Sequence, residues 1–196
     1  QEFDPALIIS VDHGGTRVVK NVYARGLGIP VVVTDHHLKP EAGPPVSALA
    51  VFHIPALSGS GVAYVVARFI YDHFKHTLSD AVKKQLDDMF QTDYLCLASI
   101  GSVADLVPLV GPTRSIVYHG LEAFAKTKRV GLLELMKQAG IAGRPVTPYE
   151  IGFVIAPRIN AIGRLEHALD ALRLLCTPNL TKAQELTQKL AETNTK

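Results

Sequence analysis

Short apolar runs alternate with helical periodicity in the first quarter of the chain. Residues 6–11 and 29–34 are continuous apolar, β-branched runs, and residues 16–25 between them place apolar side chains on one helical face. This order predicts a strand, a helix and a second strand, and such continuous runs are typical of parallel strands covered on both faces. Residues 48–52 predict one more strand after a loop rich in proline and glycine.

Helical periodicity dominates the rest of the chain. The predicted fold class is α/β, with a parallel sheet of βαβ units at the N-terminal end followed by a mostly helical region. Residues 1–55 are expected to form the parallel part, residues 56–180 the helical part, and residues 181–196 the start of a polar connector helix to a second domain. We expect both ends to be cut from a longer protein. The predicted helices are 61–75, 79–104, 113–126, 130–139, 148–156, 165–176 and 181–193.

The composition is that of a soluble globular protein and does not indicate a binding partner. The chain has 196 residues, of which 47% are hydrophobic and 19% charged, and its apolar runs are far shorter than the ~20 residues of a membrane span. Residues 1–12 lack the pattern of a secretory signal, and Cys96 and Cys176 lie within helical patterns. We therefore expect reduced, buried thiols and a cytoplasmic protein with no membrane partner. A net charge of +2 is too small to indicate nucleic-acid binding by itself.

Polar side chains follow two of the predicted strands. Asp12 comes directly after the first strand, and Asp35, His36 and His37 come directly after the second. Because the carboxyl ends of parallel strands meet at one edge of a sheet, these side chains should surround one crevice. Carboxylate and imidazole ligands together suit a first-row divalent ion and favour manganese over the oxygen-only sites typical of magnesium. The alternative for an isolated Asp-His-His triplet is a capped surface loop.

Further segments carry candidate residues. Asp105 ends an apolar stretch, where a charge is costly unless it is paired or binds a metal; the alternative is a helix-end aspartate in solvent. Arg158, Asn160 and Arg164 lie among small residues, and guanidinium groups bind phosphate in a bidentate manner. This pattern predicts an anion-binding cluster, and the alternative is a set of solvated arginines paired with nearby acids. Residues 57–69 are more typical of a tight turn into a core helix than of a phosphate-binding loop.

The ordered set of segments resembles the DHH phosphoesterase superfamily, and within it the RecJ-type exonucleases that degrade single-stranded DNA from 5′ to 3′. VDHG at residues 11–14 is similar to the second family motif, TDHH at 34–37 to the third, and SVADLVPL at 102–109 to the fourth. PRINAIGRL at 157–165 is similar to a segment typical of RecJ proteins. The family's first motif, an Asp-x-Asp loop, is expected upstream of this chain, and His13 stands where the family usually has Asn.

The resemblance implies metal-dependent phosphodiester hydrolysis in DNA repair and recombination, with Mn²⁺ or Mg²⁺ in a two-metal site. Asp12, His36 and Asp105 would be metal ligands. His37 would contact the scissile phosphate, and Asp35 would accept a hydrogen bond that orients an imidazole. Since the first motif is missing, we expect this chain alone to bind metal weakly and to have little nuclease activity.

Substrate and partners also follow from the resemblance. Arg158, Asn160 and Arg164 would hold substrate phosphates, single-stranded DNA is the expected partner, and single-strand-binding protein or a helicase would be a further one. Aromatic platforms for base stacking are not expected, because the Phe and Tyr residues mostly fit helix core positions. Two alternatives stay open: a phosphodiesterase for short oligonucleotides or cyclic dinucleotides, and a catalytically inactive replication scaffold of the same fold.

Overall fold

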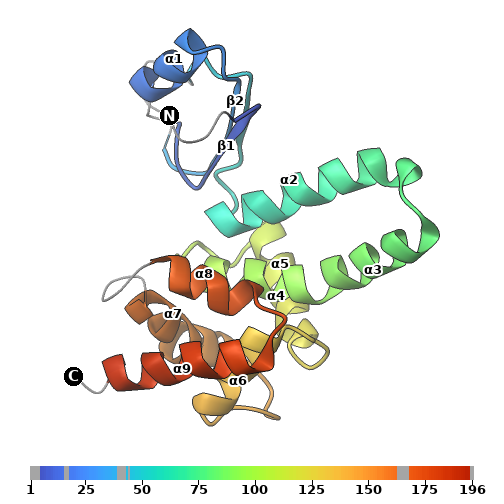
Figure 1. Ribbon diagram of the computed structural model, residues 1–196, viewed down its shortest axis with the longest axis vertical. Helices are drawn as coiled ribbons and strands as arrows, with labels where there is room; N and C mark the ends of the chain where they lie inside the picture. Colours follow the sequence, from blue (N-terminus) through green and yellow to red (C-terminus); the bar gives the residue numbers. More distant parts are fainter. Residues whose placement is uncertain (1–4, 16–17, 39–42, 44, 163–167, 195–196) are drawn as a thin grey trace.

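A small sheet and a larger helical part make up the computed structural model (Figure 1). Strands β1 (Ile8–Val11), β2 (Val31–Asp35) and β3 (Ala50–His53) form one parallel sheet in the order β1-β2-β3. Helix α1 (Val18–Gly26) connects β1 to β2, which confirms the predicted βαβ unit. The structure describes residues 5–15, 18–38, 43, 45–162 and 168–194.

The register of the sheet aligns the carboxyl ends of its strands. Val11 lies beside Thr34, and Asp35 lies beside His53. Strand β2 lies in the middle and is buried along almost all of its length, as a continuous apolar run requires. Strand β1 lies at the edge and is mostly exposed, so the expected cover on both faces holds for β2 but not for β1.

Helices α2 (Gly59–Phe74) and α3 (Asp80–Gln91) form a hairpin that projects from the rest of the molecule (Figure 1). A short 3₁₀ turn, η1 (Lys75–Thr77), joins them. Helix α2 begins after Ser58, whose side-chain oxygen accepts a hydrogen bond from the Gly61 N–H at 3.1 Å. This N-cap confirms the predicted turn into a core helix.

The long helix predicted for residues 79–104 is interrupted. Thr92 lies between α3 and α4 (Asp93–Ala104) and belongs to neither helix. The Thr92 hydroxyl donates to the Asp88 carbonyl at 2.7 Å, and the Thr92 backbone leaves the helical region with φ −127° and ψ −87°. A threonine hydroxyl bonded to the carbonyl four residues earlier often bends a helix, and the bend here coincides with the break.

The core of the molecule lies among the later helices, and α4 and α5 form its most extensive pair. Gly131 allows α6 to approach α8 closely, because a Cβ at this position would lie 1.7 Å from the Leu174 carbonyl oxygen. Ala183 and Leu186 of the last helix are buried in the same core. These helices are α5 (Gly111–Ala123), α6 (Val130–Gln138), α8 (Ala168–Cys176) and α9 (Leu180–Asn194).

The helix predicted for residues 148–156 is a wide π-helical turn, η2 (Glu150–Ile155), which continues into α7 (Ala156–Ile162). Pro157 has no N–H to continue an α-helical ladder, and the wider turn that precedes it accommodates this loss. Such turns are frequent at functional sites.

The two cysteines differ in exposure. Cys96 is fully buried in the core, whereas Cys176 is exposed, so the prediction of a buried thiol is wrong for Cys176. Cys176 is the last residue of α8, and the buried side chain of this helix is that of Leu174, two residues earlier. Among the described residues, no helix combines the length and apolar character needed to cross a bilayer.

Candidate metal centre at the carboxyl edge of the sheet

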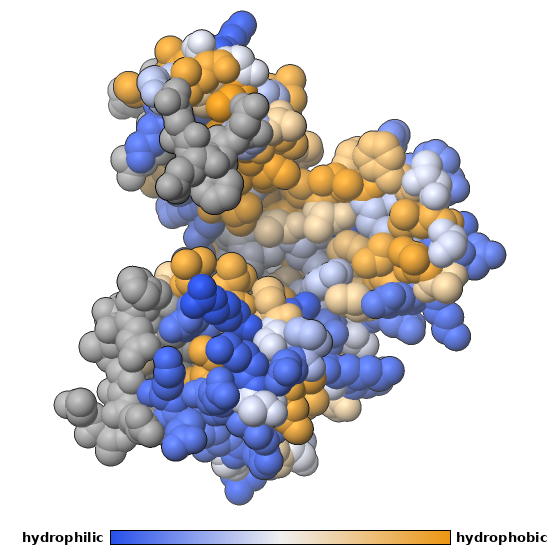
Figure 2. Space-filling view, in the orientation of Figure 1, coloured by the Kyte–Doolittle hydropathy of each residue, from blue (hydrophilic) through white to orange (hydrophobic). Residues whose placement is uncertain are grey.

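Three segments converge where the strands end. Asp12 follows β1, His36 follows β2, and Asp105 caps the C-terminus of α4. The His36 Nε2 lies 3.1 Å from the Asp12 Oδ1 and 3.4 Å from the Asp105 Oδ2. The structure thus brings together the three residues that the sequence proposed as metal ligands. Figure 2 shows a notch between the sheet part above and the helical part below.

The arrangement of these three side chains suits a shared cation. The His36 Nε2 is buried and makes no hydrogen bond within the described structure, although two carboxylate oxygens lie close to it. A buried imidazole nitrogen without a hydrogen bond is costly. A divalent ion bound by this nitrogen and by both carboxylates would satisfy all three groups. Ligand atoms of Asp12, His36 and His37 also lie within 4.8 Å of one another.

The backbone holds Asp12 in an unusual conformation. Its φ is +62°, and its N–H donates to the Thr34 carbonyl at 3.0 Å, which extends the β1–β2 ladder into the turn. Gly59, the first residue of α2, lies against the carboxylate, because a Cβ there would be 2.1 Å from the Asp12 Oδ1. The partial positive charge of a helix N-terminus favours a carboxylate at this place. Aspartate adopts a positive φ more readily than most residues, and such conformations are enriched at functional sites.

Asp35 organises the turn that carries both histidines. Its buried carboxylate accepts hydrogen bonds from the Gly15 N–H at 2.8 Å, the His36 N–H at 2.8 Å and the His37 N–H at 3.2 Å. It also accepts one from the ring Nδ1 of His37 at 2.7 Å. Burial alone would raise the pKa of Asp35, but the His37 ring and the three backbone donors outweigh it and lower this pKa to about 2.

His37 points its remaining ring nitrogen away from Asp35. The hydrogen bond to Asp35 raises the pKa of His37, and the carboxylates of Asp12 and Asp105 act in the same direction. The imidazole is 59% exposed, so its Nε2 is available to a ligand. A protonated imidazole at this place can donate a hydrogen bond to a phosphate oxygen.

His53 is a residue of this edge that the sequence prediction missed. It ends β3 beside Asp35, and its ring Nε2 donates to the His37 carbonyl oxygen at 2.6 Å. A carbonyl oxygen only accepts, so this nitrogen carries the proton. His53 therefore holds the main chain of His37 from the neighbouring strand. Its place at the carboxyl end of a third parallel strand was the signal that could have identified it.

Two residues of the predicted anion-binding cluster, Arg158 and Asn160, lie on α7. Arg158 is partly buried and donates from Nη1 to the Val154 carbonyl at 2.9 Å, whereas Asn160 is exposed. Arg164 lies outside the described residues. Neither Arg158 nor Asn160 contacts the metal-site side chains in any described hydrogen bond or ion pair.

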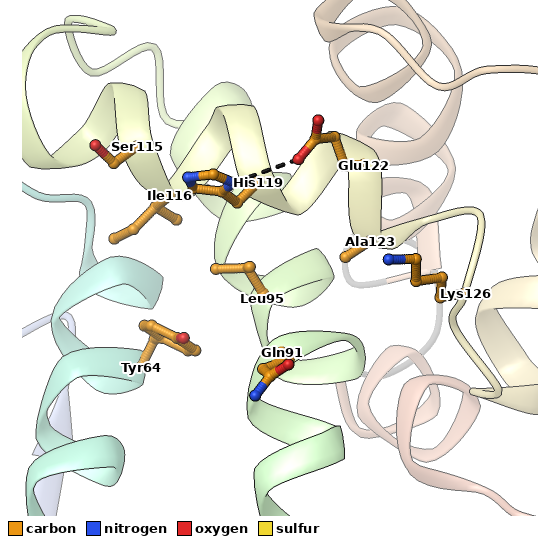
Figure 3. A pocket seen from close by; sticks show the side chains of 9 residues that line it. All are labelled: Tyr64, Gln91, Leu95, Ser115, Ile116, His119, Glu122, Ala123 and Lys126. Carbon is orange, nitrogen blue, oxygen red and sulfur yellow. Dashed lines mark hydrogen bonds and ion pairs between the residues drawn. The ribbon is translucent and has the colours of Figure 1, made fainter.

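A pocket of about 420 Å³ lies between α2, α4 and α5, apart from this edge (Figure 3). His119 and Glu122 turn toward each other at its rim, with Nδ1 and Oε2 3.3 Å apart, and Tyr64 and Leu95 line its interior. Both members of the ion pair are about 60% exposed, and such surface pairs contribute ~1 kcal/mol at most. The pocket shares no residue with the converging carboxylates.

The fold and this edge define an α/β protein with a candidate divalent-metal centre at the carboxyl end of a parallel sheet. Residues 3–100 match the N-terminal domain of the DHH family, and the chain belongs to this family. The region that matches contains Asp12 and the DHH triplet at residues 35–37.

Known relatives of the chain are described as single-stranded-DNA-specific exonucleases. The chain is 35% identical to the single-stranded-DNA-specific exonuclease RecJ of Bacillus subtilis, over 96% of this chain and 23% of that protein. It is 33% identical to the RecJ of Haemophilus influenzae, over 96% of this chain and 34% of that protein. The chain therefore spans between about a quarter and a third of the length of these relatives.

Solved structures agree with the fold. RecJ from Thermus thermophilus in complex with Mn²⁺ matches with a TM-score of 0.79 at 32% identity, over 97% of this chain and 28% of that chain. RecJ from the same organism in complex with Mg²⁺ matches with a TM-score of 0.63 at 26% identity, over 96% of this chain and 31% of that chain.

Proposed function

We propose that this chain is part of a metal-dependent exonuclease that hydrolyses phosphodiester bonds of single-stranded DNA from the 5′ end. The observation that carries the proposal is the convergence of Asp12 and Asp105 on the buried Nε2 of His36, which makes no hydrogen bond within the described residues. The description shared by the relatives, and the Mn²⁺ and Mg²⁺ ions of the RecJ structures, support the same reaction and cofactor.

Each residue of the edge has a role in this proposal. Asp12, His36 and Asp105 bind the cation, which when bound activates water and offsets the negative charge that develops on phosphate oxygens. His37 donates a hydrogen bond from Nε2 to the phosphate at which the bond is cleaved. Asp35 orients His37 through Nδ1 and, by staying ionised, favours the protonated imidazole.

Residues outside the edge hold the substrate. Arg158 and Asn160 of α7, together with Arg164, bind the phosphates of the DNA strand through charge-assisted hydrogen bonds. Single-strand-binding protein or a helicase is a further proposed partner, since the unpaired strand has to be produced and kept accessible. We propose the cytoplasm as the compartment, in keeping with a buried Cys96 thiol and no disulfide among the described residues.

Calorimetric titration with Mn²⁺ tests the cation site. His36→Ala should weaken Mn²⁺ binding by about tenfold or more, because it removes the central ligand. The matched control is His119→Ala, which removes an exposed histidine of the Figure 3 pocket and should leave binding unchanged. Equal affinities for the wild-type chain and His36→Ala would contradict the assignment.

Digestion of 5′-labelled DNA tests the reaction. At high protein concentration we expect slow cleavage that requires Mn²⁺ and is faster for a single strand than for a duplex. His36→Ala and Asp105→Ala should abolish it. Faster turnover of a dinucleotide than of a long strand would favour the oligonucleotide phosphodiesterase instead, and Mn²⁺-dependent cleavage that His36→Ala and Asp105→Ala leave unchanged would contradict the proposal.

A further inference from the structure

Two exposed aromatic rings lie stacked on the segment that leads into α7. The ring centroids of Tyr149 and Phe153 are 5.0 Å apart, and their planes differ by 29°. Tyr149 is 63% exposed and Phe153 is 71% exposed. The expectation that Phe and Tyr residues fill core positions is therefore wrong for this pair. The two rings lie over each other, and the outer parts of both are exposed to solvent.

Other exposed aromatic residues do not offer such a surface. Phe74 meets its neighbour His73 at an interplanar angle of 84°, and Tyr118 meets His119 at 86°. Both pairs are edge-to-face and join adjacent residues of one helix. Among the described residues, the stacked exposed pair is found only at Tyr149 and Phe153.

The position of the pair connects the two parts of the candidate site. Phe153 lies in η2, which continues directly into α7 with Arg158 and Asn160. On its other side η2 packs on α4: a Cβ on Gly152 would lie 3.9 Å from Val103, which is two residues before Asp105. The segment that carries the rings thus continues into the proposed phosphate-binding residues and packs against the helix that ends at Asp105.

Helix stabilisation alone is a weaker explanation. Rings spaced i, i+4 on a helix stabilise it by only about 0.2–0.5 kcal/mol. The start of this helix already has a cap, because the Glu150 carboxylate accepts hydrogen bonds from the Thr147 N–H and hydroxyl. These hydrogen bonds also lower the pKa of Glu150, and Arg144 acts in the same direction. Glu150 therefore stays ionised and caps the start of the helix without a contribution from the rings.

We propose that Tyr149 and Phe153 form a stacking platform for the unpaired bases of a single nucleic-acid strand. The proposal rests on the proposed function and adds where the bases of the substrate bind. Every base has a π-face, so stacking on an aromatic ring tolerates any sequence, and it requires bases that are not already paired within a duplex. Phosphates of the same strand would extend toward Arg158 and Asn160.

Tryptophan fluorescence tests the platform directly, because the chain has no tryptophan. Phe153→Trp places a single reporter in the pair, and Phe69→Trp places one at a similarly exposed position, 64% exposed, on α2. Each is titrated with a short oligothymidylate in EDTA, so that no hydrolysis takes place. We expect saturable quenching for Phe153→Trp and none for Phe69→Trp. An abasic strand with the same number of phosphates should not quench either reporter.

Affinity measurements complete the test. Phe153→Leu keeps an apolar side chain but removes the ring, and should weaken binding of the labelled oligothymidylate by about fivefold or more, while Phe69→Leu should not. Equal quenching of both reporters, quenching by the abasic strand, or unchanged affinity of Phe153→Leu would overturn the platform. Base-dependent quenching in a chain whose cleavage does not depend on His36 and Asp105 would support the platform and defeat the proposed metal site, so the two failures are separate.

Discussion

Asp35 illustrates how one buried carboxylate fixes the geometry of its neighbours. Four donors from three residues surround it, and only 4% of its side chain is exposed. Each donor is a backbone N–H or an imidazole, so the charge is balanced by directed hydrogen bonds and not by a lysine or arginine. These hydrogen bonds stabilise the fold only while the Asp35 carboxylate is ionised.

Stability should therefore depend on pH through Asp35. Its pKa is lowered from 3.8 to about 2, so the stabilising contribution is complete above pH ~4 and is lost as the pH falls through 2. Asp35→Asn should lower the free energy of unfolding by about 2 kcal/mol at neutral pH and should flatten the loss of stability below pH ~4. Urea unfolding at several pH values measures both effects. Asp80→Asn, at an exposed carboxylate of α3, controls for the loss of one charge, and an acid limb as steep in Asp35→Asn as in the wild type would contradict the prediction.

At the scale of elements, the N-terminus of α2 serves both packing and the site. Gly59 leaves room for the Asp12 carboxylate, and Ser58 caps the helix from a position that is only 1% exposed. The Ser58 hydroxyl also lies 2.8 Å from the Ser102 hydroxyl of α4. The turn at Ser58 and Gly59 thus leaves room for the Asp12 carboxylate, caps α2 and links α2 to α4.

Ser58→Ala should destabilise the fold by about 1–2 kcal/mol, because it removes an N-cap and leaves buried partners without a hydrogen bond. Ser79→Ala is the matched control, since Ser79 caps α3 at an exposed position through the Val82 N–H at 3.4 Å. Its loss should be smaller, by about half or more. Urea unfolding followed by circular dichroism gives both values. A Ser58→Ala variant no less stable than Ser79→Ala would show that the cap does not contribute as described.

At the scale of the whole molecule, the helical part holds the main core and the sheet part holds the functional edge. Leu132, Leu135, Ile151 and Leu174 are fully buried in the helical part. The sheet has only a small cluster around Val31 and Val33. The site therefore lies between a well-packed body and a thinner layer, with α2 packed against both.

The two thiols, both in the helical part, differ in burial. Burial raises the pKa of Cys96 to about 12, with Asp93 acting in the same direction, whereas Cys176 is exposed. Because the thiolate is the reactive species, a chromogenic disulfide reagent should modify one thiol of the native chain quickly and the other only on global unfolding. Cys176→Ser should remove the fast reaction, and the slow reaction of Cys96 should then follow the urea unfolding curve. Rapid modification of Cys96 in the native variant would disprove the burial of Cys96 in α4.

Periodicity predicted the elements because it depends on neighbours in sequence. The strand ending at Asp35 and the helix after Ser58 follow from the apolar run and the cap, with ends within a few residues. The break at Thr92 and the wide turn before Pro157 were missed, since each depends on local backbone bonding that competes with a helix of good periodicity. Exposure of Cys176 and Phe153 was also missed, because an apolar side chain does not reveal which partner covers it.

The sequence by itself determined which residues can carry the chemistry: two acids and an imidazole at predicted element ends, in the order of the DHH motifs. Only the tertiary structure decided that the Asp12 and Asp105 carboxylates both lie close to the His36 imidazole. It also decided that His53 donates a hydrogen bond to the His37 main chain, and that two exposed rings stack before α7. The physical reason is that strand register and helix packing set these distances, and both arise from contacts between segments far apart in the chain.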